Sequence, residues 1–174
     1  MQAENPYQPP QSDVSNPPPL PGETSELAGR WERLGAAIVD GLLLLVIMAP
    51  LMYFGGYFGA AMEAAQRGQQ LGIGQILLWT LIGFVVFVAV QAYPLNLNGQ
   101  TWGKKLLDIK IVDLAGSKPA LATLFVKRYL PIQVISAIPI IGPLFGLVNV
   151  LFIFRADKRC IHDLIAGTRV VSAK

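Results

Sequence analysis

Long runs of apolar residues dominate this sequence and predict membrane helices. The run 34–54 holds 21 residues whose only charge is Asp40, and at about 1.5 Å per residue such a helix covers a hydrocarbon core of about 30 Å. A second run, 73–93, lies inside an interval of 36 residues without a charge, and Pro94 is expected to end its helix. The pattern therefore predicts two transmembrane spans, at about 34–54 and 73–93.

The third apolar region, 129–154, has 26 uncharged residues but contains three prolines, so one straight helix is not expected. It forms either a single span after an interfacial amphipathic helix over 120–137, whose Lys127 and Arg128 reach the headgroups, or a helical hairpin turning at 139–143. The first alternative leaves the C-terminus outside, whereas the second returns the C-terminal bases to the cytoplasm. The positive-inside rule favours the hairpin, although two full crossings would need about 20 residues each.

Two short segments outside these runs have the pattern of small strands. Residues 106–113 and 168–172 can pair only if both lie on one side of the membrane. The first 28 residues hold seven of the thirteen prolines, four acids and no Lys or Arg, so 1–28 is expected to be a disordered tail. This tail is either a solvated spacer or a ligand for a proline-binding protein partner. Residues 29–174 form the predicted membrane domain.

Composition supports the membrane assignment. Of the 174 residues, 53% are hydrophobic and 14% are charged, about half the charge of an average soluble domain. The predicted fold class is therefore an all-α integral membrane protein with two full transmembrane helices, a proline-broken third region and a small two-stranded cytosolic element.

The distribution of charge suggests an orientation and a partner. The net charge is +3, and the basic residues lie beside apolar runs without an aromatic-laced stripe, which favours anionic lipid headgroups over nucleic acid. Basic residues precede the first run and follow the second, whereas the linker between the two runs has no net charge. The positive-inside rule then places the N-terminus in the cytoplasm.

Asp40 is the most informative side chain, because a carboxylate inside an apolar span must be protonated, paired or beside water. Arg33 lies two helical turns earlier on the same face. Their Cα atoms are then about 10.5 Å apart, so a third group or water is expected between them. The pair is either an ion or proton site or a polar clamp between helices.

Further polar residues are candidates for supporting roles. Gln91 is expected to be an interhelical hydrogen-bond partner, and Lys104 to face lipid from a turn after the second span. His162 beside Asp163 either relays protons or belongs to a basic collar in which Asp163 pairs with arginine. One Cys and one His exclude a disulfide and most metal sites, so no metal and no cofactor are expected.

Three segments resemble the RDD family of small membrane proteins, which is named for one arginine and two aspartates. Residues 30–40 resemble the family's opening, 99–113 resemble the turn and strand after its second helix, and 162–171 resemble its closing motif. The resemblance covers about 28–174 and implies Arg33, Asp40 and Asp163 as the named residues, with Asp157 a weaker second aspartate. A bacterial plasma (inner) membrane location is also expected. Sodium–proton antiport has been proposed for some members of the family.

Two functions remain open at this point. The first is an oligomeric cation or proton transporter, in which Asp40 exchanges a cation and Asp163 with His162 guards the cytoplasmic mouth. The second is a non-catalytic scaffold or assembly factor, in which Arg33 bridges to Asp163, Asp40 fastens helices, and the tail recruits partners. An enzyme is not expected, because the sequence offers no nucleophile, base and acid set.

Overall fold

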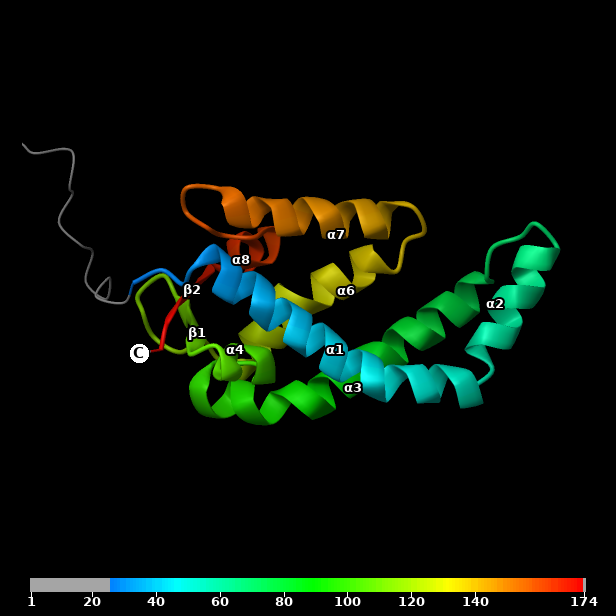
Figure 1. Ribbon diagram of the computed structural model, residues 1–174, viewed down its shortest axis with the longest axis horizontal. Helices are drawn as coiled ribbons and strands as arrows, with labels where there is room; N and C mark the ends of the chain where they lie inside the picture. Colours follow the sequence, from blue (N-terminus) through cyan, green and yellow to red (C-terminus); the bar gives the residue numbers. More distant parts are fainter. Residues whose placement is uncertain (1–25, 174) are drawn as a thin grey trace, which may run out of the picture.

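A computed structural model describes residues 26–173 and shows a mostly helical chain built on two long apolar helices. Helix α1 (Arg30–Phe54) and helix α3 (Ile73–Asn98) run along the length of the molecule (Figure 1). Helix α2 (Tyr57–Gln66) joins their far ends, a helix that the sequence pattern did not predict. Within the described residues, α1 and α3 are the helices with the length and composition to cross a membrane.

Both long helices are longer than their predicted spans. Helix α1 begins at Arg30 rather than 34, because the Glu32 carboxylate accepts the Gly29 N–H at 2.8 Å and caps the additional turn. Helix α3 continues to Asn98, so the prediction that Pro94 ends it is wrong. Proline leaves the carbonyl four residues earlier without its N–H partner. In this fold the Trp102 indole N–H donates to that carbonyl, on Val90, at 2.9 Å.

The third apolar region folds as a helical hairpin. Its first arm comprises three segments: α5 (Leu121–Thr123), the π-helical η1 (Leu124–Tyr129) and α6 (Leu130–Ser136). The chain turns before α7 (Ile141–Leu151), which packs against α6 and continues as the short 3-10 turn η2 (Phe152–Phe154). The first arm packs against α3, and the chain enters the first arm and leaves the second near the sheet end of the molecule (Figure 1). Each arm is shorter than α1 or α3.

The predicted pairing of two short strands is confirmed. Strand β1 (Ile109–Asp113) lies antiparallel to β2 (Thr168–Ser172), with Ile111 opposite Val170. Strand β1 is shorter than the predicted 106–113, because helix α4 (Trp102–Leu106) occupies the start and Asp108, at φ 51°, turns the chain. A last helix, α8 (Ile161–Ala166), leads directly into β2.

Residues at the start of the described chain join this sheet. Leu27 pairs with Val171 beside β2, and the Ala28 N–H donates to the Val170 carbonyl at 3.1 Å. The predicted tail 1–28 therefore overlaps the folded unit at its last residues, and its residues 1–25 lie outside the described part of the chain.

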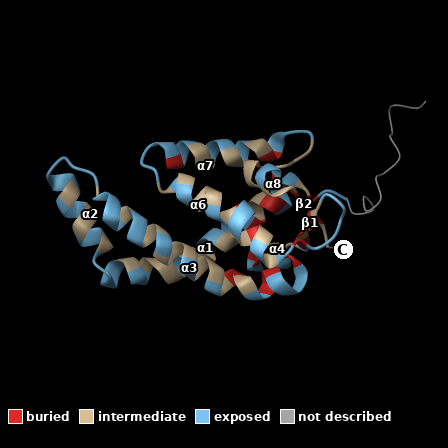
Figure 2. Cartoon of the chain, turned by 180° about the vertical axis from the view of Figure 1, so that it is seen from behind, coloured by how far each residue is buried: buried red, intermediate tan, exposed pale blue. Residues whose placement is uncertain are grey.

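The core lies at the sheet end of the molecule. Its buried apolar side chains come from the strands, the starts of α1 and η1, and the end of α3: Ala28, Ala36, Leu95, Ile109, Ile111, Leu124 and Val170. Buried positions gather around β1, β2, α4 and α8, whereas the long helices and α2 are largely exposed (Figure 2). Apart from Asp157, which lies in the turn before α8, the polar residues predicted to carry function lie on elements that converge at this end.

Candidate functional site

Asp40 is held by three hydrogen-bond donors of the chain itself. The Gln91 Nε2 group on α3 donates to its carboxylate at 3.0 Å, and the Thr101 hydroxyl donates at 2.5 Å. The backbone N–H of Gly103, in α4, donates at 2.8 Å. A single carboxylate thereby joins α1, α3 and α4. Arg33, the predicted partner of Asp40, pairs with Asp163 instead, so the donors around Asp40 are Gln91 and the residues that follow α3.

Gln91 extends this contact into a network. Its side chain is 0% exposed, and its carbonyl oxygen accepts the backbone N–H of Trp102 at 3.0 Å. One amide thus bonds Asp40 with its NH2 group and the first turn of α4 with its oxygen. Because the hydrogen bonds of Asp40 and Gln91 run between different elements, the network fixes how α4 sits against the two long helices.

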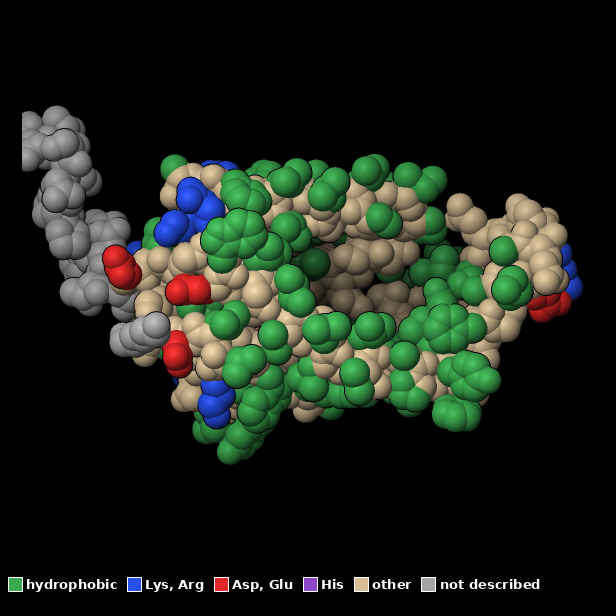
Figure 3. Space-filling view, in the orientation of Figure 1, with side chains coloured by type: hydrophobic (Ala, Val, Ile, Leu, Met, Phe, Trp, Pro, Cys, Tyr) green, Lys and Arg blue, Asp and Glu red, His purple; other side chains and the backbone are tan. Residues whose placement is uncertain are grey.

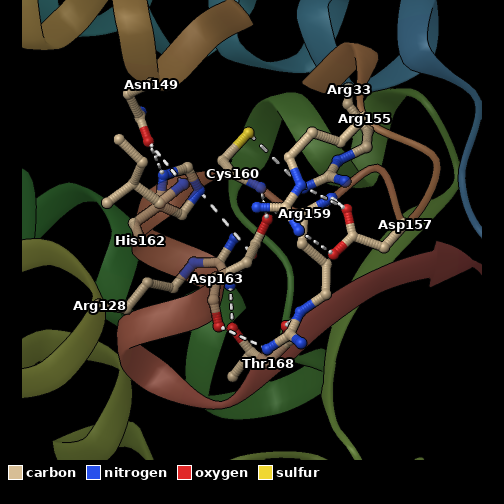
Figure 4. A network of polar contacts seen from close by, with 11 residues as sticks. Arg33, Arg128, Asn149, Arg155, Asp157, Arg159, Cys160, His162, Asp163 and Thr168 are labelled. Atoms are coloured by element: carbon tan, nitrogen blue, oxygen red, sulfur yellow. Dashed lines mark hydrogen bonds and ion pairs between the residues drawn. The ribbon is translucent and has the colours of Figure 1, made fainter. Parts of the chain in front are cut away.

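A buried ion cluster centres on Asp163, the third residue of α8. The guanidinium groups of Arg33, from α1, and Arg128, from η1, contact its two carboxylate oxygens, and the Arg128 Nη1–Oδ1 distance is 2.5 Å (Figure 4). The Cys160 backbone N–H donates to Oδ2 at 3.0 Å, so the same carboxylate caps α8. Arg128 also donates to the Thr168 hydroxyl at 2.5 Å. The cluster joins α1, the hairpin, α8 and β2.

The two guanidiniums keep Asp163 ionised. Burial alone would raise the pKa of this carboxyl, but the positive charges of Arg128 and Arg33 and the Cys160 N–H outweigh it and hold the pKa well below its usual range. The sequence left His162 and Asp163 as either a proton relay or part of a basic collar. The geometry brings Asp163 to two arginines instead of to the imidazole.

His162 is held in a neutral form by the same surroundings. Its Nδ1 lies 3.1 Å from the Asn149 amide oxygen, which only accepts, so Nδ1 carries the proton. The Nε2 atom is 3.8 Å from the Asp163 carboxylate, beyond hydrogen-bond distance. Burial and the charge of Arg128 lower the pKa of His162 to about 3. A direct proton relay from His162 to Asp163 is therefore not assembled at neutral pH.

The lowered pKa of His162 is expected to make the folded chain less stable at acidic pH. Its pKa is about 3 in the folded chain and near 6.5 when unfolded, so the unfolded chain binds more protons across that window and stability falls as pH falls. One proton gives about 1.4 kcal/mol per pH unit, or about 2 kcal/mol lost at pH 5. Asp163 adds its own loss only at still lower pH, because its folded pKa is depressed.

The measurement is the thermal unfolding midpoint in detergent at pH 7.5 and pH 5. We expect His162→Gln to remove most of the fall in midpoint, because this is the one histidine of the chain. An unchanged fall in the variant would show that other groups cause the acid sensitivity.

Two of the supporting candidates lie elsewhere than expected. Asp157 contacts Arg155 at 3.2 Å on the partly exposed surface and takes no part in the buried cluster. Lys104 does not face lipid as predicted: it is partly buried, and its Nζ lies 3.5 Å from the Thr101 hydroxyl. Lys104 also lines a small cavity together with Arg33 and Arg128, which places it between the Asp40 network and the Asp163 cluster.

The sequence missed Arg128, Thr101 and Gly103. It placed Arg128 at the headgroups, but this residue is 1% exposed and turns inward to Asp163. The sequence contains little sign that Arg128 is buried, because the adjacent basic residue, Lys127, is exposed as predicted. Thr101 caps the start of α4 and Gly103 lies in its first turn, shortly after α3 ends. Their position shortly after an apolar span is the one feature that could have marked them as partners of Asp40.

A metal ion does not fit the one group of possible ligands among the described residues. Cys160, His162 and Asp163 place ligand atoms within 4.8 Å of one another. The Asp163 carboxylate, however, is bonded to two guanidiniums, whose positive charge opposes a bound cation. This cluster is therefore built for ion pairing within the chain.

A larger cavity of about 640 Å³ lies between α1, α3 and the hairpin (Figure 3). None of its described lining residues is charged. Its polar groups are amides and hydroxyls, such as Gln133 on α6 and Thr80 on α3. Leu44 and Phe87 also line it, and these residues stand one helical turn from Asp40 and Gln91. The cavity thus approaches the Asp40 network along the two long helices.

Comparisons with known proteins agree with these landmarks. A family model described as the RDD family matches residues 27–167. A Bacillus subtilis protein named "Uncharacterized protein YckC" is 30% identical over 146 residues, which is 84% of this chain and 85% of that protein. A Haemophilus influenzae protein named "Uncharacterized protein" is 24% identical over 144 residues, 83% of this chain and 77% of that protein. No solved structure gives a significant match.

Proposed function

This chain belongs to the RDD family, and on that premise we propose that it is an integral membrane protein that serves as a scaffold or assembly factor. Helices α1 and α3 cross the inner membrane of a bacterium, and the sheet end stands on the cytoplasmic face. The acidic, proline-rich tail recruits a protein partner there, and the membrane helices allow self-association. No catalytic chemistry is part of this proposal.

Membrane insertion is supported by the exposure of the long helices. In the most apolar 18-residue window of each, 6% of α1 and 0% of α3 is buried by the rest of the chain. The core helix of a soluble protein would bury such a surface, because exposed apolar area of this extent is unfavourable in water. Lipid is the solvent that fits these helices.

The orientation is supported by the charges at the two ends. Basic residues lie near the starts of α1 and α4 at the sheet end, where Figure 3 shows both basic and acidic side chains, whereas α2 at the opposite end carries the exposed Glu63–Arg67 pair at 2.6 Å. A neutral outer end and a basic sheet end satisfy the positive-inside rule with the sheet in the cytoplasm.

The observation that carries the scaffold proposal is that both family aspartates are already bonded within the chain. Asp40 accepts three donors, and Asp163 pairs with two guanidiniums and accepts a backbone N–H. An ion carrier needs a carboxylate that exchanges its ligands during the cycle. Carboxylates that tie three or four elements together are better suited to holding a cytosolic platform against membrane helices.

Cation or proton transport is the second candidate, and one observation favours it. The 640 Å³ cavity ends one turn from Asp40, so a modest movement of Leu44 and Phe87 would open a path to that carboxylate. The cavity has no charged lining residue among those described, which weakens it as a route for a bare cation.

Asp40→Asn separates the two candidates. The amide oxygen can accept from Gln91 and Gly103, and the amide NH2 can donate to the Thr101 hydroxyl once that hydroxyl turns round. The variant therefore keeps the network while losing the charge. We expect the substitution to lower the free energy of unfolding by about 1 kcal/mol or less, which is seen as a small fall in the thermal midpoint. Glu63→Gln, in the exposed pair, is the matched control.

The measurement is proton flux in reconstituted vesicles under an imposed sodium or potassium gradient. The scaffold proposal expects no flux above empty vesicles for wild type, Asp40→Asn or Glu63→Gln. It also expects that, after chemical cross-linking in native membranes, the wild type and both variants are each found bound to a second protein. Flux in wild type that vanishes in Asp40→Asn, with the fold intact, would overturn the scaffold and establish transport.

A further inference from the structure

A second cavity, of about 100 Å³, is lined by an unusual concentration of positive charge. Arg33, Lys104 and Arg128 reach it from three separate elements, with Asn149 and His162 on another side. Figure 4 shows Arg33, Arg128, Asn149 and His162 around the Asp163 cluster. A single water needs roughly 10–15 Å³ of such space, so this cavity has room for a polyatomic ion.

The charges around the cavity do not balance within the described chain. Asp163 provides one negative charge, and both Arg33 and Arg128 are bonded to it. Asp40 provides a second, which acts on Lys104, so the three cations outnumber the two carboxylates by one. His162 contributes none, because it is neutral. Arg128 is 1% exposed, and its Nε has no hydrogen-bond partner among the described residues. Since a buried donor without a partner is costly, this nitrogen marks a place where an acceptor is missing.

Lys104 supplies an independent sign of the same imbalance. Its ammonium group donates to the Thr101 hydroxyl at 3.5 Å, a long distance for a hydrogen bond. Burial and the charge of Arg128 lower the pKa of Lys104 to about 8, against the opposing effect of Asp40. An anion in the cavity would face Lys104 and Arg128 together and would offset their repulsion.

We propose that this cavity binds a phosphoryl group, either free inorganic phosphate or the headgroup phosphate of an anionic phospholipid. Guanidinium and ammonium groups are the side chains that bind phosphate oxygens, and the volume suits one tetrahedral group. The cavity lies beside the first turns of α1, where lipid headgroups stand if α1 crosses the bilayer. A metal cation is excluded by the three surrounding positive charges.

The test compares two adjacent lysines of the full chain. Lys104→Gln removes a charge that lines the cavity, whereas Lys105→Gln removes one that is exposed and lies 5.5 Å from the Trp102 ring, outside the lining. Neither lysine contacts Asp163, so both variants are expected to fold. Purified protein in neutral detergent is titrated with inorganic phosphate at constant ionic strength, with chloride as the balancing salt, and the thermal midpoint is followed.

A second arm distinguishes the lipid source. The same proteins are placed in nanodiscs of phosphatidylcholine with or without phosphatidylglycerol, and retained lipid is measured by native mass spectrometry. We expect a saturable effect in at least one arm that Lys104→Gln weakens about tenfold and Lys105→Gln leaves unchanged. Phosphate binding in detergent assigns free phosphate, and retention of phosphatidylglycerol alone assigns the headgroup.

The proposal is overturned by either of two results. The first is no saturable effect in both arms. The second is an equal loss in Lys104→Gln and Lys105→Gln, which would mean that anions respond to surface charge and not to the cavity.

Discussion

Replacing Asp163 with asparagine is expected to cost about 3–5 kcal/mol of folding free energy, the largest single effect that we predict. The amide is nearly the same size and can still accept the Cys160 N–H, so helix α8 keeps its cap. What disappears is the one negative charge bonded to Arg33 and Arg128, whose guanidiniums stay buried. Two positive charges without a counterion in a desolvated site are far more costly than a lost hydrogen bond.

The expected readout is a loss of the monodisperse peak in detergent-based size-exclusion chromatography, or a thermal midpoint lowered well beyond that of any other single polar variant. Asp157→Asn is the matched control, since it removes the same charge from the partly exposed pair with Arg155. Adding Arg128→Gln to Asp163→Asn should restore part of the stability. A variant Asp163→Asn as stable as Asp157→Asn would show that the cluster is solvated in the folded protein.

The sequence was sufficient to locate the two long helices and both strands because those predictions rest on local pattern. Uninterrupted apolar runs and short segments with a strand-like pattern have the same meaning in almost any fold. Pro94 was misleading because the carbonyl that it leaves without a donor is bonded by the Trp102 indole N–H. Trp102 comes close to this carbonyl only when α4 folds back against α3. Tertiary structure thus overrode a sound local rule.

The polar site was harder to predict for a related reason. Asp40 was identifiable since a charge in an apolar run is conspicuous, but its partners are a threonine and a backbone N–H in a turn, neither of which stands out in composition. Arg128 was misplaced because η1 is π-helical, and a wider turn shifts which residues of the arm face inward relative to a regular 3.6-residue period. Only the assembled hairpin shows that Arg128 reaches Asp163.

Gly103→Ala is expected to be the second most damaging change, although glycine is ordinarily a poor helix residue. A Cβ atom at position 103 would lie 2.2 Å from the Ala36 carbonyl oxygen and 3.0 Å from the Asp40 carboxyl carbon. Both are fixed parts of α1, so α4 must move away and the Gly103 N–H must leave Asp40. The overlap should cost about 2–3 kcal/mol, which exceeds the roughly 1 kcal/mol that alanine gains as a helix former.

The matched control is Gly41→Ala, one residue after Asp40, where an added Cβ meets nothing within 4 Å. Its thermal midpoint in detergent should equal or slightly exceed that of wild type, whereas Gly103→Ala should fall well below it. The comparison tests the architecture directly, because only the close approach of α4 to α1 distinguishes the two glycines. Equal behaviour of the two variants would mean that α4 does not seat on Asp40, and the carboxylate would then be available for exchange with water or a cation.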